Sequence, residues 1–358
     1  MASTILDQPQ KLSRRDPEGM LQKVMDLPFH CQDARYRVLN HPPVLRAKGI
    51  QSVVLSGLGG SAIGGDILRT FLWKSAPFSV TVNRHYELPG WVTRKTLVVC
   101  SSYSGNTEET LSVFRQVLAR KIPMLVMASG GKLLEQARRL KLPFCEMPGG
   151  LPPRAAFGYS FFTLLTALES LGLLPSQEKS FEETLENLTR LSEAYGVLKG
   201  TRENPAKQLA KFLHGRLPVL YAGQDHMDSV ALRWKCQLNE NAKQLALANV
   251  VPEMNHNEVL GFSFSNPISR NMAVVLLKHP QEDHPQIKKR FGILRGILQG
   301  RTAGVREVEA QGKSLLAQML SLIYLGDFVS VYLAYLKGID PTPIKLIDQF
   351  KKQLSRGH

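Results

Sequence analysis

Apolar and polar residues alternate in blocks along most of this chain, and the blocks have the lengths of strands and helices. Short runs rich in Val, Leu and Met are followed by segments with apolar residues at helical spacing, such as Leu111, Phe114 and Leu118. In the first half we predict strands over 52–57, 78–87, 96–102, 123–129 and 143–148, and helices over 61–73, 107–120, 132–140 and 155–174. Strands that alternate with helices indicate a parallel, doubly wound sheet.

The same pattern returns in the second half, after a polar interval. The first forty residues predict a helical leader, with a helix ending near Asp26, and residues 175–205 predict a charged helix that joins the halves. Beyond that helix we predict strands over 217–223, 273–279 and 304–310, and helices over 228–243, 285–300 and 314–338.

The two halves can be laid side by side, so we predict two related α/β domains. "VVLSGLGGSAIGGDILRTFL" has the pattern of "PVLYAGQDHMDSVALRWKCQL", and each half ends in a strongly apolar helix. The predicted fold is α/β, with two mainly parallel, doubly wound sheets flanked by helices. The predicted divisions are a leader at 1–40, a first domain at 41–174, a linker at 175–205 and a second domain at 206–358.

Composition indicates a soluble protein, and we expect it in the cytoplasm. The chain has 358 residues, of which 43% are hydrophobic, enough for a substantial core. No apolar run approaches the roughly 20 residues that span a membrane, and the N-terminus has no apolar segment of the signal-peptide type. The four cysteines form no CxxC pair and no zinc-ligand spacing, so buried reduced thiols are expected rather than a disulfide.

The formal charge of +15 is compatible with nucleic acid, with a small anionic substrate or simply with solubility. The basic residues are spread along the chain, and no helix-turn-helix, zinc-finger or RNA-binding aromatic motif accompanies them. We therefore expect neither a nucleic-acid nor a membrane partner, and favour a small anion.

Two loops rich in glycine and hydroxyl groups follow predicted strands and lead into predicted helices. They are "GLGGSAIGGD" at 57–66 and "SSYSGNTEE" at 101–109. Ligands of parallel sheets bind outside the carboxyl ends of the strands, and helix N-termini favour anions. Neither loop has the lysine of a P-loop or the spacing of a dinucleotide fingerprint. Ser102, Ser104 and Thr107 could simply cap a helix, but two such loops at neighbouring strand ends favour an anion site.

Three further residues have chemistry that a pattern alone leaves open. Glu240 in "NENAK" shares a helix face with Leu232 and Cys236, which fits either a buried salt bridge or a general base of raised pKa. His256 in "NHNE" fits either a turn or an acid–base group, and no second histidine at ligand spacing suggests a metal. Arg154 fits either a surface cap or a fixed charge that faces an anion.

Taken in order, "GLGGSAIGGD", "SSYSGNTEET", "PPRAAFGY", "NENAK" and "PEMNHNEVLGF" resemble the bifunctional phosphoglucose/phosphomannose isomerase family. That family is built from two sugar-isomerase (SIS) domains. The resemblance runs from about Asp16 to the C-terminal "DPTPIKLIDQFKKQL", and "NENAK" with "NHNE" is its most specific part. Leu58 stands where methionine is common in the family, a neutral difference.

The resemblance implies a role for each matching residue. Gly60, Ser61, Ser102, Ser104 and Thr107 would form the sugar-phosphate pocket. Glu240 would move a proton between carbons 1 and 2, and Arg154 would stabilise the enediolate. His256 would assist ring opening from the partner subunit of a homodimer. A C-terminal lysine would complete the site; Lys351 fits best, with Lys345 and Lys352 as alternatives.

The implied activity is a metal-independent aldose–ketose isomerase that interconverts fructose 6-phosphate with glucose 6-phosphate and with mannose 6-phosphate. No cofactor is expected. One alternative is a non-catalytic sugar-phosphate regulator, which would need the serine loops but neither Glu240 nor His256. Another is an isomerase specific for one hexose or amino-sugar phosphate.

Overall fold

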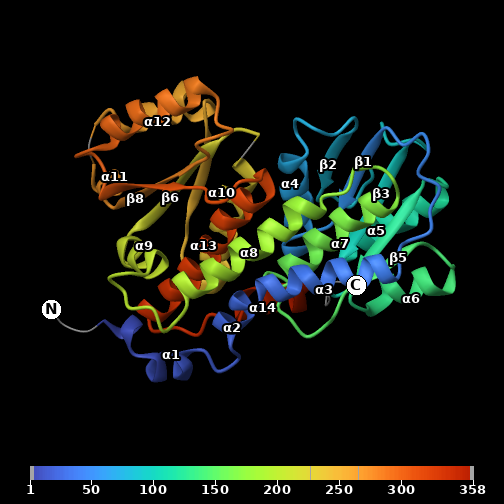
Figure 1. The fold of residues 1–358 in the computed structure, drawn as a ribbon, viewed down its shortest axis with the longest axis horizontal. Helices are drawn as coiled ribbons and strands as arrows, with labels where there is room; N and C mark the ends of the chain where they lie inside the picture. Colours follow the sequence, from blue (N-terminus) through green and yellow to red (C-terminus); the bar gives the residue numbers. More distant parts are fainter. Residues whose placement is uncertain (1–3, 226, 265, 355–358) are drawn as a thin grey trace.

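The computed structural model describes residues 4–225, 227–264 and 266–354, and they form two α/β halves joined side by side (Figure 1). The first half holds a parallel five-stranded sheet in the order β2-β1-β3-β4-β5. Its strands are β1 (Ser52–Ser56), β2 (Ser79–Asn83), β3 (Thr96–Ser102), β4 (Met124–Ala128) and β5 (Phe144–Glu146). Its helices are α4 (Gly60–Phe71), α5 (Glu108–Ala119), α6 (Gly131–Arg139) and α7 (Phe157–Ser170).

The second half repeats this arrangement around a parallel four-stranded sheet in the order β7-β6-β8-β9. Its strands are β6 (Leu217–Gly223), β7 (Leu247–Val251), β8 (Met272–Lys278) and β9 (Gly304–Glu309). Its helices are α9 (Pro205–Leu213), α10 (Asp228–Ala242), α11 (Pro267–Arg270), α12 (Pro285–Leu298), α13 (Leu315–Leu336) and α14 (Lys345–Leu354), with short 3-10 turns η2 (Glu253–His256) and η3 (Glu258–Phe262). The order of β2-β1-β3-β4 corresponds position by position to that of β7-β6-β8-β9, so the predicted fold class is confirmed.

Four elements of the second half, β7, α9, α11 and α14, were missing from the sequence-based prediction, as were the short 3-10 turns η2 and η3. The strand β7 lies at the edge of its sheet and is largely half-buried, so its residues lack a continuous apolar run. The helix α9 begins at Pro205, in what was assigned as the end of the linker, and α14 is a polar C-terminal helix with no buried residue.

The N-terminal residues pack against both halves. The 3-10 turn η1 (Ile5–Asp7) and the helices α1 (Pro9–Arg15), α2 (Met20–Met25) and α3 (Leu27–Asn40) make up this region, with α3 against α7 of the first half and α2 against α13 of the second. The predicted helix end near Asp26 is confirmed, because α2 ends at Met25 with Asp26 as its C-cap; a further helix, α3, starts directly afterwards and continues to Asn40. A side chain at Gly158 of α7 would lie 2.8 Å from the Cβ atom of His30, so α3 and α7 pack in close contact.

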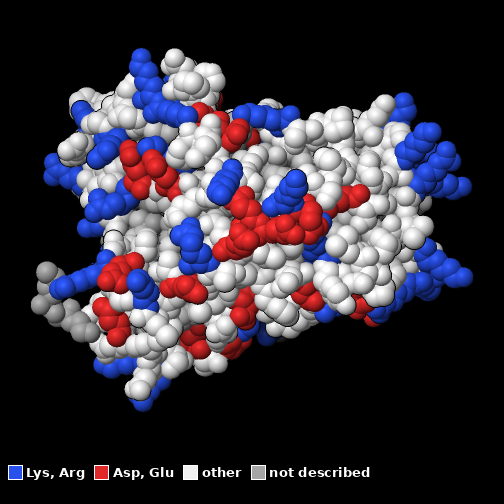
Figure 2. All heavy atoms as spheres, in the orientation of Figure 1, with Lys and Arg blue, Asp and Glu red and all other residues white. Residues whose placement is uncertain are grey.

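The predicted linker region forms α8 (Glu178–Tyr195), which packs against α13 and buries Leu188 and Leu191, while its Phe181 contacts Phe162 of α7 and Arg35 of α3. Acidic side chains gather over the middle of the face seen in Figure 2, where α8 runs in Figure 1, and basic side chains lie toward both ends. The domain divisions remain predictions.

The helix α13 corrects one expectation from the sequence. It is long and apolar enough to cross a membrane, contrary to the statement that no run approaches this length. However, 94% of its most apolar stretch is buried within the protein, as expected of the core helix of a soluble protein. It contacts α8, α9 and α10, and the largest apolar core is continuous through it between the two sheets.

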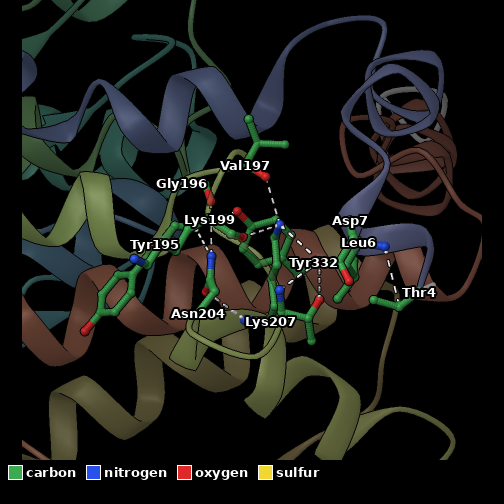
Figure 3. A network of polar contacts seen from close by, with 11 residues as sticks. Thr4, Leu6, Asp7, Tyr195, Gly196, Val197, Lys199, Asn204, Lys207 and Tyr332 are labelled. Carbon is green, nitrogen blue, oxygen red and sulfur yellow. Dashed lines mark hydrogen bonds and ion pairs between the residues drawn. The ribbon is translucent and has the colours of Figure 1, made fainter. Parts of the chain in front are cut away.

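A buried lysine fixes the connection between the halves (Figure 3). Lys207 of α9 is fully buried, and its Nζ atom donates hydrogen bonds to the carbonyl oxygens of Val197, at 2.8 Å, and Lys199, at 2.7 Å. Asp7 lies 3.9 Å from the same nitrogen, and the ring of Tyr332 packs beside it. Burial lowers the pKa of Lys207. One side chain thus ties the N-terminal region, the turn after α8 and α13 together.

Three of the cysteines, Cys31, Cys100 and Cys145, are buried free thiols, and burial raises the pKa of each. Cys236 is free but only partly buried.

Candidate active site

The site lies where α4 of the first half runs alongside α10 of the second, in antiparallel directions. At one end, Thr70 Oγ1 and Ser229 Oγ are 2.5 Å apart, and Arg69 pairs with Asp228. Toward the other end, the two helices open into a pocket of about 220 Å³. It is lined by Gly59, Gly60, Ile63, Arg84, Arg154, Leu232, Arg233, Cys236, Gln237 and Glu240.

The glycines of the first loop allow backbone segments to pack closely. A Cβ atom at Gly60 would lie 2.5 Å from the carbonyl oxygen of Pro153, so Gly60 lets α4 begin directly against the segment that carries Arg154. Gly59 has a φ of +51°, which side chains other than glycine rarely adopt. In the second loop, a Cβ atom at Gly105 would lie 1.8 Å from the carbonyl oxygen of Gly130. These glycines therefore lock both loops in place.

The structure brings the hydroxyl residues of both loops to one place, at the carboxyl ends of the neighbouring strands β1 and β3. Ser61 Oγ accepts a hydrogen bond from the backbone N–H of Tyr103, at 2.8 Å, which ties the first loop to the second. Ser102 Oγ and Thr107 Oγ1 lie 2.8 Å apart. Ser104 Oγ accepts from the N–H of Asn106 at 3.3 Å. Thr107 is the N-cap residue of α5, but its side chain makes no capping hydrogen bond. Helix capping therefore does not explain this threonine.

Arg154 is a buried connector between the halves. Its Nε atom donates to Asn241 Oδ1 at 2.6 Å, and its Nη2 atom donates to the carbonyl oxygens of Pro341, at 2.9 Å, and Thr342, at 2.8 Å. Its Nη1 atom lies 3.6 Å from Glu240 Oε2. The guanidinium has five N–H groups, three of which these bonds use, so the two on Nη1 are the ones that remain for a ligand. The alternative of a surface cap is wrong, because Arg154 is only 3% exposed.

Glu240 lines the pocket with its carboxylate toward Arg154. Burial raises its pKa, while the positive charges of Arg154, Arg233, Lys243 and Lys351 oppose this effect. The side chain is 27% exposed, so the ion pair remains open to the pocket. Among the described residues that line the pocket, three are arginines and Glu240 is the acidic one. The structure thus combines the two alternatives from the sequence: Glu240 is paired, and it is also accessible.

A buried network holds the rest of α10 in position. Arg233 Nη2 donates to Asp327 Oδ2 of α13 at 2.6 Å and to the carbonyl oxygen of Arg154 at 3.2 Å. Gln237 Nε2 donates to the other Asp327 oxygen at 2.8 Å. Asn241 Nδ2 donates to Ser330 Oγ at 2.9 Å. Because Asn241 also accepts from Arg154, the network sets the distance between Arg154 and Glu240.

Lys243, at the end of α10, holds the segment that leads to α14. Its Nζ atom donates to the carbonyl oxygens of Pro341, at 2.7 Å, and Asp340, at 3.1 Å. Burial and the neighbouring Arg154 lower its pKa to about 8. The carbonyl oxygen of Pro341 therefore accepts hydrogen bonds from both cations, and this anchors the chain just before α14.

The C-terminal lysines lie on α14. The charge of Lys351 lowers the pKa of Glu240, so Lys351 is close enough to act on that carboxylate. Lys345 begins the same helix, and Lys352 follows Lys351. This electrostatic contact favours Lys351 among the three, and the assignment stays a prediction.

The structure does not bring His256 to the pocket within one chain. His256 is exposed at the end of η2, after the edge strand β7, and is absent from the described pocket lining. Beside it, Asn257 Nδ2 donates to Glu253 Oε1 at 2.9 Å, and Glu258 accepts from Tyr221 at 2.6 Å.

Sequence reasoning missed several residues of the site, and most had a signal. Arg84 follows β2 and forms an ion pair with the buried Asp66, at the sheet edge where ligand loops gather. Arg233 and Gln237 precede Glu240 at helical spacing. Asp327 is an isolated carboxylate in the most apolar helix, a pattern that calls for a buried partner.

Known proteins resemble this chain over most of its length. The family described as "Bacterial phospho-glucose isomerase C-terminal SIS domain" matches residues 202–354. A protein of Caldicellulosiruptor bescii named bifunctional phosphoglucose/phosphomannose isomerase is 42% identical over 336 residues, which cover 94% of this chain and 99% of that protein. A protein of the same name from Aquifex aeolicus is 39% identical over 308 residues, 86% of this chain and 91% of that protein.

The fold has solved counterparts as well. The crystal structure of a glucose-6-phosphate isomerase-like protein from Thermus thermophilus matches with a TM-score of 0.64 over 98% of this chain and 99% of that one, at 18% identity. At that identity the likeness concerns the fold alone.

Proposed function

We propose a reaction for this site from the premise that the chain belongs to the bifunctional phosphoglucose/phosphomannose isomerase family. The protein is an aldose–ketose isomerase acting on hexose phosphates, and it interconverts fructose 6-phosphate with glucose 6-phosphate and mannose 6-phosphate. The observation that best supports this reaction is one pocket in which the accessible carboxylate of Glu240 lies 3.6 Å from a fixed guanidinium, and which Gly59 and Gly60 of the first serine loop help to line.

The phosphate group would bind at the N-terminal ends of α4 and α5. Ser61, Ser102, Ser104 and Thr107 offer hydroxyl groups there, and Gly60 offers backbone at the start of α4. Helix N-termini stabilise a phosphate through their free N–H groups and their dipoles. Binding at this end would hold carbon 2 of the sugar beside Glu240, which converts binding energy into positioning.

Glu240 would act as the base that moves the proton. From the open-chain aldose, its carboxylate takes the proton of carbon 2, the electrons shift to the carbonyl oxygen on carbon 1, and a cis-enediolate forms. Returning the proton to carbon 1, while the hydroxyl proton on the carbon 2 oxygen moves to the carbon 1 oxygen, gives the ketose. Returning it to either face of carbon 2 restores the aldehyde and gives glucose or mannose 6-phosphate. The raised pKa of Glu240 fits this role, because a base whose pKa lies nearer the working pH both accepts and returns the proton readily.

Two cations would stabilise the enediolate. The N–H groups on Arg154 Nη1 are the donors left over from its structural hydrogen bonds, and they point toward the reacting carboxylate. Lys351 would supply a second charge from α14. Since these groups of the chain provide the base and the positive charge, we expect turnover without a metal.

We propose that the protein works as a homodimer with shared sites, in the cytoplasm. His256 of the partner subunit would open the sugar ring by moving the proton of the anomeric hydroxyl to the ring oxygen as the bond between that oxygen and the anomeric carbon breaks. Support comes from the exposed position of His256, outside the pocket of its own chain.

The test is NMR of fructose 6-phosphate with the protein in D₂O containing EDTA. Deuterium at carbon 2 of both glucose and mannose 6-phosphate is the expected result. Product of a single epimer would leave the mechanism and remove the dual specificity. No exchange, with fructose 6-phosphate shown to bind in the same sample, would refute the proposed chemistry and favour a sugar-phosphate regulator. Loss of exchange in EDTA that Mg²⁺ restores would refute the metal-free mechanism.

A further inference from the structure

A second pocket lies at the opposite edge of the first sheet from the serine loops. Its volume is about 590 Å³, and its lining includes residues just before β1, β3, β4 and β5, whose carboxyl ends point the other way. At ~3.3 Å per residue, a strand the length of β3 separates the two edges by roughly 20 Å. The lining residues are Leu45, Arg46, Lys48, Ile50, Arg94, Val117, Leu118, Lys121, Ile122, Pro123, Met124, Leu142 and Pro143.

The chemistry of this lining is divided between two kinds of side chain. Nine of the residues are apolar and the other four, Arg46, Lys48, Arg94 and Lys121, are basic; none of the described lining residues is acidic. The four basic side chains belong to exposed residues, and none forms an ion pair or side-chain hydrogen bond with another described residue. The pocket thus has an apolar floor, formed by the nine apolar residues, and a cationic rim, formed by the four basic side chains, whose positive charges no described acidic side chain neutralises.

One of the four cations has a local explanation. Lys121 follows the C-terminus of α5, where a positive charge favours the helix dipole. Arg46, Lys48 and Arg94 lie on two other segments, which precede β1 and β3 and end no helix there. Their convergence on one apolar floor therefore needs another reason, and a bound anion supplies it.

We propose that this pocket binds a nucleoside polyphosphate, with the base and ribose on the apolar floor and the phosphates on the cationic rim. Four cations match a compact group of several negative charges better than a single phosphate. The floor has no hydroxyl or amide side chain among its described residues to bind the hydroxyl groups of a hexose, so a second substrate molecule would fit poorly. The volume lies within the roughly 300–1,000 Å³ usual for small-ligand sites.

Calorimetric titration with ATP in EDTA and low salt tests the proposal, with adenosine and tripolyphosphate as probes of the floor and the rim alone. ATP should bind at least about tenfold more tightly than either probe. The double variant Arg46→Gln/Lys48→Gln should raise the Kd for ATP by about tenfold, because each exposed charge contributes at most about fivefold. The matched control Arg139→Gln/Lys179→Gln removes the same charge from exposed positions outside the pocket and should leave the Kd unchanged. Both double variants should retain wild-type turnover of fructose 6-phosphate.

Several results would overturn the proposal. Equal affinity for tripolyphosphate and ATP would mean that the rim attracts charge without a site for the base. Displacement of ATP by saturating fructose 6-phosphate would place ATP at the serine loops. Equal weakening in the two double variants would reduce the effect to net charge, and an absence of saturable binding of ATP would remove the site.

Discussion

Replacing Glu240 with glutamine separates the proposed chemistry from substrate binding. Glutamine has the shape of glutamate, so the packing beside Cys236 and Arg154 is kept, but its amide cannot accept the proton of carbon 2. The phosphate loops lie at the ends of β1 and β3, and among the described residues their hydroxyl groups form no hydrogen bond with Glu240. Substrate affinity should therefore change little.

The expected loss follows from the role of a placed base. Positioned proton transfer contributes roughly 10²–10⁴-fold to rate, which corresponds to a barrier increase of about 3–5 kcal/mol. The kcat of Glu240→Gln should fall by that factor. Its KM for fructose 6-phosphate should stay within about threefold, because a group that acts only in the transition state affects kcat and not substrate binding.

The assay couples glucose 6-phosphate formation to a dehydrogenase and follows NADPH, with NMR detection of deuterium exchange as a direct measure of proton transfer. Glu186→Gln, an exposed carboxylate on α8, is the matched control and should behave as wild type. Equal melting temperatures would show that both variants are folded. If Glu240→Gln kept its kcat within threefold of wild type, Glu240 would not be the base, and the pocket between α4 and α10 would have to be reconsidered.

Three further predictions concern the helix α14, the dimer and the buried lysine. Lys351→Met should move the acidic limb of the kcat/KM profile to higher pH, because the Lys351 charge lowers the pKa of Glu240 and the base must lose its proton to act. Lys345→Met should leave that limb in place. Equal shifts in the two variants would contradict the assignment of Lys351. Glu240→Gln and His256→Ala dimers, each inactive alone, should recover about a quarter of the wild-type activity when they are mixed under conditions that let subunits exchange. Half of the resulting dimers contain one subunit of each kind, and one of the two sites in such a dimer is intact. No recovery would place His256 outside the partner's site. Lys207→Met should lower the free energy of unfolding by roughly 2–4 kcal/mol in urea titrations, because two buried carbonyl groups lose their donor, and a change below 0.5 kcal/mol would contradict the role of the network in Figure 3.

Several features of the site could be predicted from local patterns in the chain. Strand and helix periods identified the two parallel sheets, and the spacing of Leu232, Cys236 and Glu240 placed the carboxylate on the face that lines the pocket. The serine loops could be assigned to the sheet edge, because ligand loops follow the carboxyl ends of parallel strands. These inferences depend on contacts within a few residues, which local periodicity records.

Other features could not be predicted, because they arise where distant segments meet. The network that joins Arg154 to Asn241 and to the carbonyl oxygens of 341 and 342 spans 188 positions of the chain, and no local pattern encodes that pairing. The second pocket is similar: its basic rim comes from separate segments, and only the packing of strands β1, β3 and β4 brings them together.

By itself, the sequence determined which elements form, on which face each side chain lies, and which loops reach the ligand edge, because backbone geometry repeats every two residues in a strand and every 3.6 in a helix. The tertiary structure alone decided the environment of each group. It placed Glu240 in a half-buried pocket beside Arg154, which raises its pKa by desolvation while leaving it accessible, and it kept His256 on the surface. Burial and charge depend on atoms from both halves of the chain, and those atoms come together only when α4 packs against α10.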